Sequence, residues 1–120
     1  VDGAIAQVRG LERVMQVHNE VEERALYLAM TRLPEYEELA GVLYDEHDEL
    51  DEIIAATLAL ADDGRADEID WRHVLRGFDV LYEHIIHEDN GLFPAAAVAL
   101  DPGDWERCER IRREAQARVG

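Results

Sequence analysis

Apolar residues recur along this chain at the three- and four-residue spacing of helices that bury one face. The stripes are separated by a proline, by an Asp-Asp-Gly sequence and by an Asn-Gly pair, all of which commonly interrupt helices. The pattern predicts four helices, at about residues 4–32, 35–62, 70–91 and 102–119. Short loops between long amphipathic helices favour antiparallel neighbours. We therefore expect an all-α fold, an up-down antiparallel four-helix bundle that forms one domain over residues 1–120.

The residues at the expected helix ends agree with this division. Asp70 and Asp101 stand where N-caps are expected, and Pro34 suits the first turn of the second helix. Asn90-Gly91 is expected to end the third helix. The fourth helix has a sparse apolar stripe, which consists of Trp105, Cys108, Ile111 and Ala115.

Polar residues interrupt the apolar stripes of the first three helices. The first stripe includes Val14, and the third includes Phe78 together with either His84 or Ile85. The polar residues that lie on the stripes rather than on the charged faces are His18, Glu22, His47, His84 and Glu88.

One motif occurs twice, with its two copies 66 residues apart. Each copy reads His-x-x-x-Glu, then an acidic residue, then a Leu-aromatic pair: HNEVEERALY at residues 18–27 and HIIHEDNGLF at residues 84–93. Because four residues make about one helical turn, the His and Glu of each copy share a face. The Leu-aromatic pairs are expected to pack in the core one turn further along.

Buried carboxylates at these positions favour a metal site. An ionised carboxylate inside a bundle is costly unless it is paired, hydrogen-bonded or bound to a cation. A lone His-x-x-x-Glu is commonly a surface pair, and a lone His47 is commonly packed in a core. Two copies in register, with His47 on the helix between them, favour a carboxylate-bridged pair of metal ions. Imidazole and carboxylate without thiolate suit iron or manganese, with zinc as an alternative.

Other titratable residues near the motif are expected to have lesser roles. His73 is expected at the surface or at a cap, and His87 at a solvated edge, with support of a ligand as its alternative. Glu23 and Asp89 are turned about 100° from the ligand stripe, so supporting or surface positions are expected.

Composition excludes several classes of partner. The net charge is −16 and the chain contains no Lys, which argues against nucleic acid and anionic membranes as partners. Cys108 is the only cysteine, so an intrachain disulfide cannot form. No apolar run is long enough to span a bilayer and no signal peptide is visible, so we expect a cytoplasmic protein.

The chain resembles the hemerythrin-like, or HHE cation-binding, family over about residues 10–100. The resemblance lies in both copies of the motif, in Glu46-His47 and in Pro94. It implies a four-helix bundle that holds a non-haem di-iron centre with an oxo or hydroxo bridge. By this resemblance, His18, His47 and His84 are terminal ligands. Glu22 and Glu88 are the carboxylates that bridge the two irons.

One expected feature of that family is missing. Its members usually carry a further ligand His on a helix before the first His-x-x-x-Glu, whereas none of the 17 residues before His18 is His. Three explanations are open. The chain is part of a longer protein, which we favour; the fourth helix folds into the vacant place; or a second copy completes the bundle as a homodimer.

The resemblance implies a function in small-molecule chemistry. We expect a di-iron protein that binds or reduces O2, NO or H2O2, with peroxide- or NO-reactive activity. The first alternative is an iron- or oxygen-responsive regulatory module without turnover. The second is a metal-free helical interaction module in which the His and Glu side chains fill a polar core.

Overall fold

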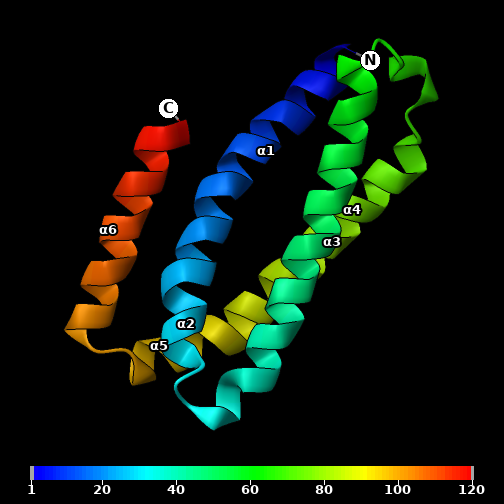
Figure 1. Cartoon of the computed structure of the whole chain (residues 1–120). Coiled ribbons are helices and arrows are strands. Elements are labelled where there is room, and N and C mark those ends of the chain that lie inside the picture. Colours follow the sequence, from blue (N-terminus) through cyan, green and yellow to red (C-terminus); the bar gives the residue numbers. More distant parts are fainter. Residues whose placement is uncertain (1, 120) are drawn as a thin grey trace.

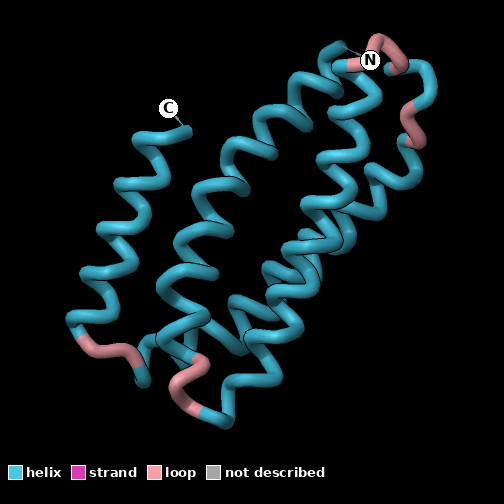
Figure 2. Tube along the Cα trace, viewed as in Figure 1, coloured by secondary structure: helices cyan, strands magenta, loops and turns pink. Residues whose placement is uncertain are grey.

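The computed structural model describes residues 2–119, which are almost entirely helical (Figures 1 and 2). η1 and η4 are single π-helical turns, whereas η2 and η3 are short 3-10 helices. The elements in chain order are α1 (Asp2–Val21), η1 (Glu22–Leu26), α2 (Tyr27–Met30), η2 (Pro34–Tyr36), α3 (Glu37–Asp62), η3 (Ala66–Glu68), α4 (Trp71–His87), η4 (Glu88–Leu92), α5 (Phe93–Ala99) and α6 (Pro102–Val119). The prediction of an all-α helical bundle is confirmed. Within the described range, no helix combines the length and hydropathy needed to cross a membrane.

The helices run alternately up and down, and three long rods form the body of the molecule (Figure 1). These are α1 with η1 and α2, then α3, then α4 with η4 and α5. α6 packs chiefly on α1 and η1, and α1 lies between α6 and the α3–α4 pair in Figure 1. Ion pairs of Arg118 with Glu20 and of Arg32 with Asp104 hold α6 in place. α6 is therefore added to the side of the three rods.

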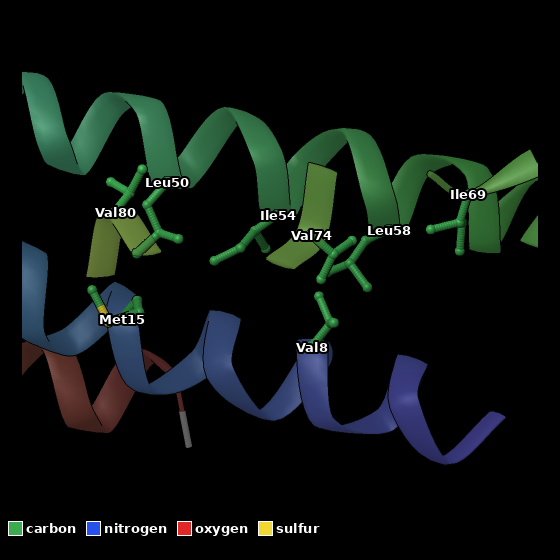
Figure 3. Packing of buried hydrophobic residues seen from close by; sticks show 8 residues of the cluster. All are labelled: Val8, Met15, Leu50, Ile54, Leu58, Ile69, Val74 and Val80. Atoms are coloured by element: carbon green, nitrogen blue, oxygen red, sulfur yellow. The ribbon is translucent and has the colours of Figure 1, made fainter. Parts of the chain in front are cut away.

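Two apolar clusters fill opposite ends of the three rods. The first cluster, drawn in Figure 3, consists of Val8, Met15, Leu50, Ile54, Leu58, Ile69, Val74 and Val80. The second cluster consists of Leu26, Tyr27, Met30, Leu43, Leu92 and Ala96. Each rod carries polar residues between the two clusters. The core is thus divided by a polar layer at the level of the repeated motif.

Side-chain caps fix the starts of two helices as predicted. Asp70 Oδ1 accepts a hydrogen bond from the backbone N–H of Arg72 at 3.1 Å, and α4 begins at Trp71. Asp101 and Asp104 cap each other's backbone N–H groups, at 2.8 and 3.1 Å, where α6 begins. These caps satisfy donors that the first helical turn leaves free.

The predicted end of the third helix at Asn90-Gly91 is wrong. The rod continues through η4 into α5 and ends at Ala99. Gly91 permits a close approach here, because a Cβ atom at this residue would lie 3.3 Å from Leu39. Its role is to let the rod pass close to α3 rather than to stop the helix.

Three aromatic or aliphatic residues expected on the buried stripes are instead exposed. Val14 is 65% exposed, Phe78 49% and Trp105 44%. The choice between His84 and Ile85 is also settled, because His84 is 2% exposed and Ile85 45%. A stripe shows which face of a helix is apolar, whereas burial also requires a neighbour on that face.

Candidate metal centre

Both copies of the motif contain a π-helical turn that begins at the Glu. In η1 the backbone N–H of Tyr27 donates to the carbonyl of Glu22, and in η4 that of Phe93 donates to Glu88. A π turn adds one residue to an α-helix and is frequent at functional sites. Because the turn occurs at the same place twice, it belongs to the motif.

All five predicted ligand residues come together. One ligand atom of each lies within 4.8 Å of the others, in the polar layer between the two apolar clusters. His84 Nε2 lies 3.3 Å from Glu88 Oε1 and 3.8 Å from Glu22 Oε1. His47 Nε2 lies 3.5 Å from Glu22 Oε1. His18 Nε2 contacts Glu22 Oε1 and lies 3.5 Å from Glu88 Oε1.

Two of the imidazoles are oriented by carboxylates on their outer nitrogens. His47 Nδ1 lies 3.0 Å from Glu23 Oε2, and His84 Nδ1 lies 3.0 Å from Glu46 Oε1. A carboxylate only accepts, so Nδ1 carries the hydrogen in each ring and the neutral ring has a lone pair on Nε2. The two Nε2 atoms are 3.0 Å apart. Two facing lone pairs repel at this distance, so the arrangement requires a cation between them, either a proton or a metal ion.

The hydroxyl of Tyr27 lies in the same layer. It is 3.2 Å from Glu22 Oε2, from Glu88 Oε2 and from His47 Nε2, although it has one hydrogen to donate. Burial, with the charge of Glu22, raises the pKa of Tyr27 far above its ordinary value, so the hydroxyl stays protonated. Glu22 Oε1 is buried and accepts no hydrogen bond of good geometry from residues 2–119. The carboxylate oxygens thus exceed the protein donors that reach them.

The charge balance of the layer favours a cation. Within residues 2–119, the charged partners of Glu22 and Glu88 are histidines, and no Arg forms an ion pair with either. Burial opposes ionisation of Glu22, but the contacts with the three imidazoles outweigh it and hold the pKa of this carboxyl well below its ordinary value. Burial likewise lowers the pKa of His47, but contacts with Glu22 and Glu23 raise it more. The site stabilises positive charge where the imidazoles meet.

The donor set fits a transition metal. Three imidazole nitrogens and four carboxylate oxygens, without a thiolate, suit iron, manganese or zinc better than an all-oxygen set would. The unpartnered Glu22 Oε1 and the facing Nε2 atoms would both be satisfied by such an ion. The residues present therefore fit one metal ion or a pair.

The residues around the layer support the imidazoles in unequal ways. Glu46 holds two rings, since its Oε2 lies 2.7 Å from His87 Nδ1 while its Oε1 faces His84. The side chain of His87 is 42% exposed, so this residue is partly solvated as expected. It also holds the carboxylate of Glu46 in position. His73 and Asp89 are exposed, as expected of surface residues.

Sequence reasoning missed the role of Tyr27 and misplaced Phe93. Both aromatics were expected in the core. Tyr27 is buried there as predicted and its hydroxyl also reaches the clustered carboxylates, whereas Phe93 is 41% exposed. A buried hydroxyl needs a hydrogen-bond partner. The Tyr in the first copy of the motif, where the second copy has Phe, could therefore have indicated a polar contact at this position. Phe93 lines a groove beside α1 because Ala96 is the buried residue of α5.

Comparison with known proteins supports the assignment. A hemerythrin HHE cation-binding domain model matches residues 2–96, which is most of the chain. Searches of curated proteins and of solved structures gave no significant match. The match covers both copies of the motif, all five clustered residues and the two π turns. The chain belongs to the hemerythrin HHE cation-binding domain family.

Proposed function

We propose that this chain is a non-haem di-iron protein that binds or reduces a small ligand, namely O2, NO or H2O2. The observation that carries the proposal is the 3.0 Å approach of the Nε2 atoms of His47 and His84, each ring being held on Nδ1 by a carboxylate. Such carboxylate support is typical of metal-binding imidazoles. Iron is preferred because carboxylate-bridged di-iron sites recur in helical bundles.

The five residues supply the ligands unequally. His47, His84, Glu22 and Glu88 are held in the buried layer, whereas the side chain of His18 is 39% exposed. Within residues 2–119, His18 has no carboxylate on its Nδ1 atom. His18 is therefore the least constrained of the three imidazoles.

A small ligand can reach the layer from the side of His18. A groove of about 510 Å³ between α1 and α6 is lined by His18, Glu22 and apolar residues that include Val17, Val21 and Leu26. Arg13, Arg112 and Gln116 also line the groove, and its apolar part gives a neutral diatomic molecule a path to His18. When bound, a pair of irons supplies an open coordination position and electrons for reduction. Tyr27, whose hydroxyl stays protonated, can donate a hydrogen bond within the polar layer.

Metal analysis tests the proposal. Purified protein is expected to contain iron in a stoichiometric amount and to show the visible absorption of a ferric pair. His84→Ala and Glu88→Ala should each abolish loading, whereas His73→Ala, which changes an exposed histidine, should retain it. Protein that binds no transition metal at stoichiometric level would contradict the proposal. Consumption of H2O2 or NO, or reversible O2 binding, then distinguishes the three ligands.

A regulatory role is the second candidate, and the position of the polar layer favours it. The layer separates the two apolar clusters and contains residues from all three rods. Metal occupancy would therefore control how firmly the rods pack against one another. A large rise in thermal stability on iron loading, without turnover of peroxide or NO, would favour this role.

A further inference from the structure

α6 lies across the first π turn. It packs on α1 and η1, with α1 between it and the α3–α4 pair (Figure 1). Its two buried residues are Ile111 and Ala115. Residues of η1 line grooves together with residues of α6, namely Glu22 with Arg112, Glu23 with Ala115, and Ala25 with Arg107. The same turn that carries a candidate ligand is therefore covered by the last helix of the chain.

Ala25 shows that this cover is close. It belongs to η1 and is 2% exposed, yet it lies outside both apolar clusters. It lines a groove with Asp104 and Arg107 of α6, so α6 is the element that buries it. Ile111 and Ala115 also lie outside both clusters. The contact between η1 and α6 thus has buried apolar residues of its own, separate from the core.

Ion pairs fix α6 at both ends of this contact. Arg118 pairs with Glu20, which precedes η1, and Asp104 lies 2.7 Å from Arg32, which follows α2. Exposed ion pairs add little stability, but these two set the direction in which α6 crosses the rod. α6 therefore bridges the chain before the π turn and the chain after it.

The second π turn is supported by a different element. η4 packs against α3, where Gly91 approaches Leu39 so closely that an added Cβ would lie 3.3 Å from it. α6 begins at Pro102, after the residues 2–96 that match the family, so membership of the family does not imply a role for this helix. The two copies of the motif differ in what holds their π turns.

We propose that α6 holds η1 in its π-helical form and so positions Tyr27 in the polar layer, with three positioning residues: Ala25, Ile111 and Ala115. A π turn competes with an ordinary α turn of the same residues, which would rotate the later part of the rod by about 100°. That rotation would take the hydroxyl of Tyr27 away from Glu22 and would disturb the contact beneath α6. Docking of α6 therefore favours the π form.

The hold of α6 on η1 does not require a metal ion. It rests on the proposed function only for what the hydroxyl of Tyr27 does in the layer, so the coupling can be measured in the metal-free chain. Protein that binds no transition metal would contradict the proposed function and leave the coupling intact. A failed coupling would leave the metal assignment intact, because His18 and Glu22 precede the residues that would rotate.

Ala115→Glu tests the coupling in the metal-free full chain, with contacts between side chains measured by NMR. A charge at this fully buried residue should release α6, so the methyl groups of Ile111 should lose their contacts with the first rod. The ring centroid of Tyr27 is 5.1 Å from that of Tyr44 on α3. This contact between the two rings should be lost together with the contacts of α6.

The second copy of the motif and an exposed residue of α6 provide the controls. The approach of Gly91 to Leu39 should persist, because η4 is supported by α3. Ala117→Glu, the same substitution at an exposed residue of α6, should change none of these contacts. The proposal would be overturned by a released α6 with the two tyrosine rings still in contact, by an α6 that stays docked in Ala115→Glu, or by an equal loss at both copies of the motif.

Ile111→Val and Ile111→Ala give a graded series that adds no charge. Each removes part of a buried side chain, so α6 should be released in a larger fraction of molecules from wild type to Val to Ala. Release is read from the methyl group of Ala115, and displacement from the ring of Tyr27. Because both belong to one equilibrium, the two signals should change in proportion along the series. Release of α6 without a matching displacement of the ring would contradict the coupling.

Discussion

The hydroxyl of Tyr27 lies 3.2 Å from Oε2 of Glu22, five residues earlier in the same rod. In an uninterrupted α-helix, residues i and i+5 are about 140° apart around the axis. The π turn η1 reduces this separation and sets Tyr27 above Glu22. Tyr27 is fully buried and also belongs to the second apolar cluster, so one residue joins the core to the polar layer.

Tyr27→Phe should destabilise the metal-free protein more than the loaded one. The change removes the only hydrogen that this hydroxyl offers to Glu22 and Glu88, and leaving a buried acceptor unsatisfied costs about 1–3 kcal/mol. A bound metal would satisfy those oxygens instead. Denaturant unfolding with and without metal measures both values. Tyr82→Phe, the same change at a 67% exposed residue, is the control. Equal losses in the two states would contradict the assignment of Glu22 and Glu88 as metal ligands.

Glu46→Gln should weaken metal binding without removing any ligand. Glu46 accepts from His84 Nδ1 and from His87 Nδ1, and loss of such a supporting carboxylate lowers metal affinity roughly 10- to 100-fold. Competition with a chelator gives the affinity. Glu52→Gln, an exposed residue on the same helix, should bind metal as tightly as wild type. Unchanged affinity in Glu46→Gln would show that His84 does not bind metal through Nε2.

The metal-free and loaded proteins should respond to pH in opposite directions. The pKa of His47 is raised above 6.5 in the fold, so its contribution to stability is complete below pH 6.5 and is lost as the pH rises through the raised value. The lowered pKa of Glu22 gives a contribution that is present above pH 4.5 and lost as the pH falls through the lowered value. The metal-free protein should therefore be most stable between these limits. Metal requires deprotonated ligands, so its stabilisation should grow as the pH rises through the raised pKa of His47, where the metal-free protein loses stability.

Unfolding curves at several pH values check this prediction, with and without metal. His47→Leu should abolish both the decline of the metal-free protein above pH 6.5 and the stabilisation by metal. If His47 is only polar filling in a metal-free module, this variant should be as stable as wild type under every condition. Parallel pH profiles for the metal-free and loaded wild type would speak against metal binding at His47.

Gly77→Ala should destabilise the fold although alanine is the better helix former. A Cβ at this position would lie 3.2 Å from Ile53 Cγ2 and 3.5 Å from Leu50 Cδ1, so the Ile53 side chain or the two helices would have to shift. These helices carry His47 and His84, and a shift of the helices would widen the spacing of the two imidazoles. Gly41→Ala is the control, because no atom lies within 4 Å of its Cβ position, and it should gain about 0.5–1 kcal/mol. Thermal unfolding measures the stability of both variants. A Gly77→Ala variant more stable than wild type would show that the surrounding atoms shift to accommodate the added methyl group.

The pairing of His with Glu in each copy of the motif could be predicted from sequence because it depends on helical periodicity alone. Residues four apart share a face in any helix, and this placed His18 with Glu22 and His84 with Glu88 before any contact was known. The caps at Asp70 and Asp101 were equally local, since each depends on one side chain and the next turn.

The remaining features depend on contacts that the sequence pattern does not contain. A π turn shifts the phase of a helix by one residue, which a period of 3.6 does not reveal, so the burial of Tyr27 was predicted but the contact of its hydroxyl with Glu22 was not. The role of Gly91 depends on how closely Leu39 approaches it. Phe78 and Val14 lie on apolar faces as expected, yet no neighbour within residues 2–119 buries them.

Each of the two π turns holds one residue more than the α-helical turn that it replaces. Deleting one residue within η1, such as the exposed Arg24, would restore an uninterrupted α-helix in which Tyr27 follows Glu22 by four residues, about 40° away around the axis. Tyr27 and the later residues of that rod would therefore keep the faces that they have now. Winding all the residues of η1 as an α-helix would instead rotate every later residue by about 100°, so the π turn and the number of residues between Glu22 and Tyr27 can change only together.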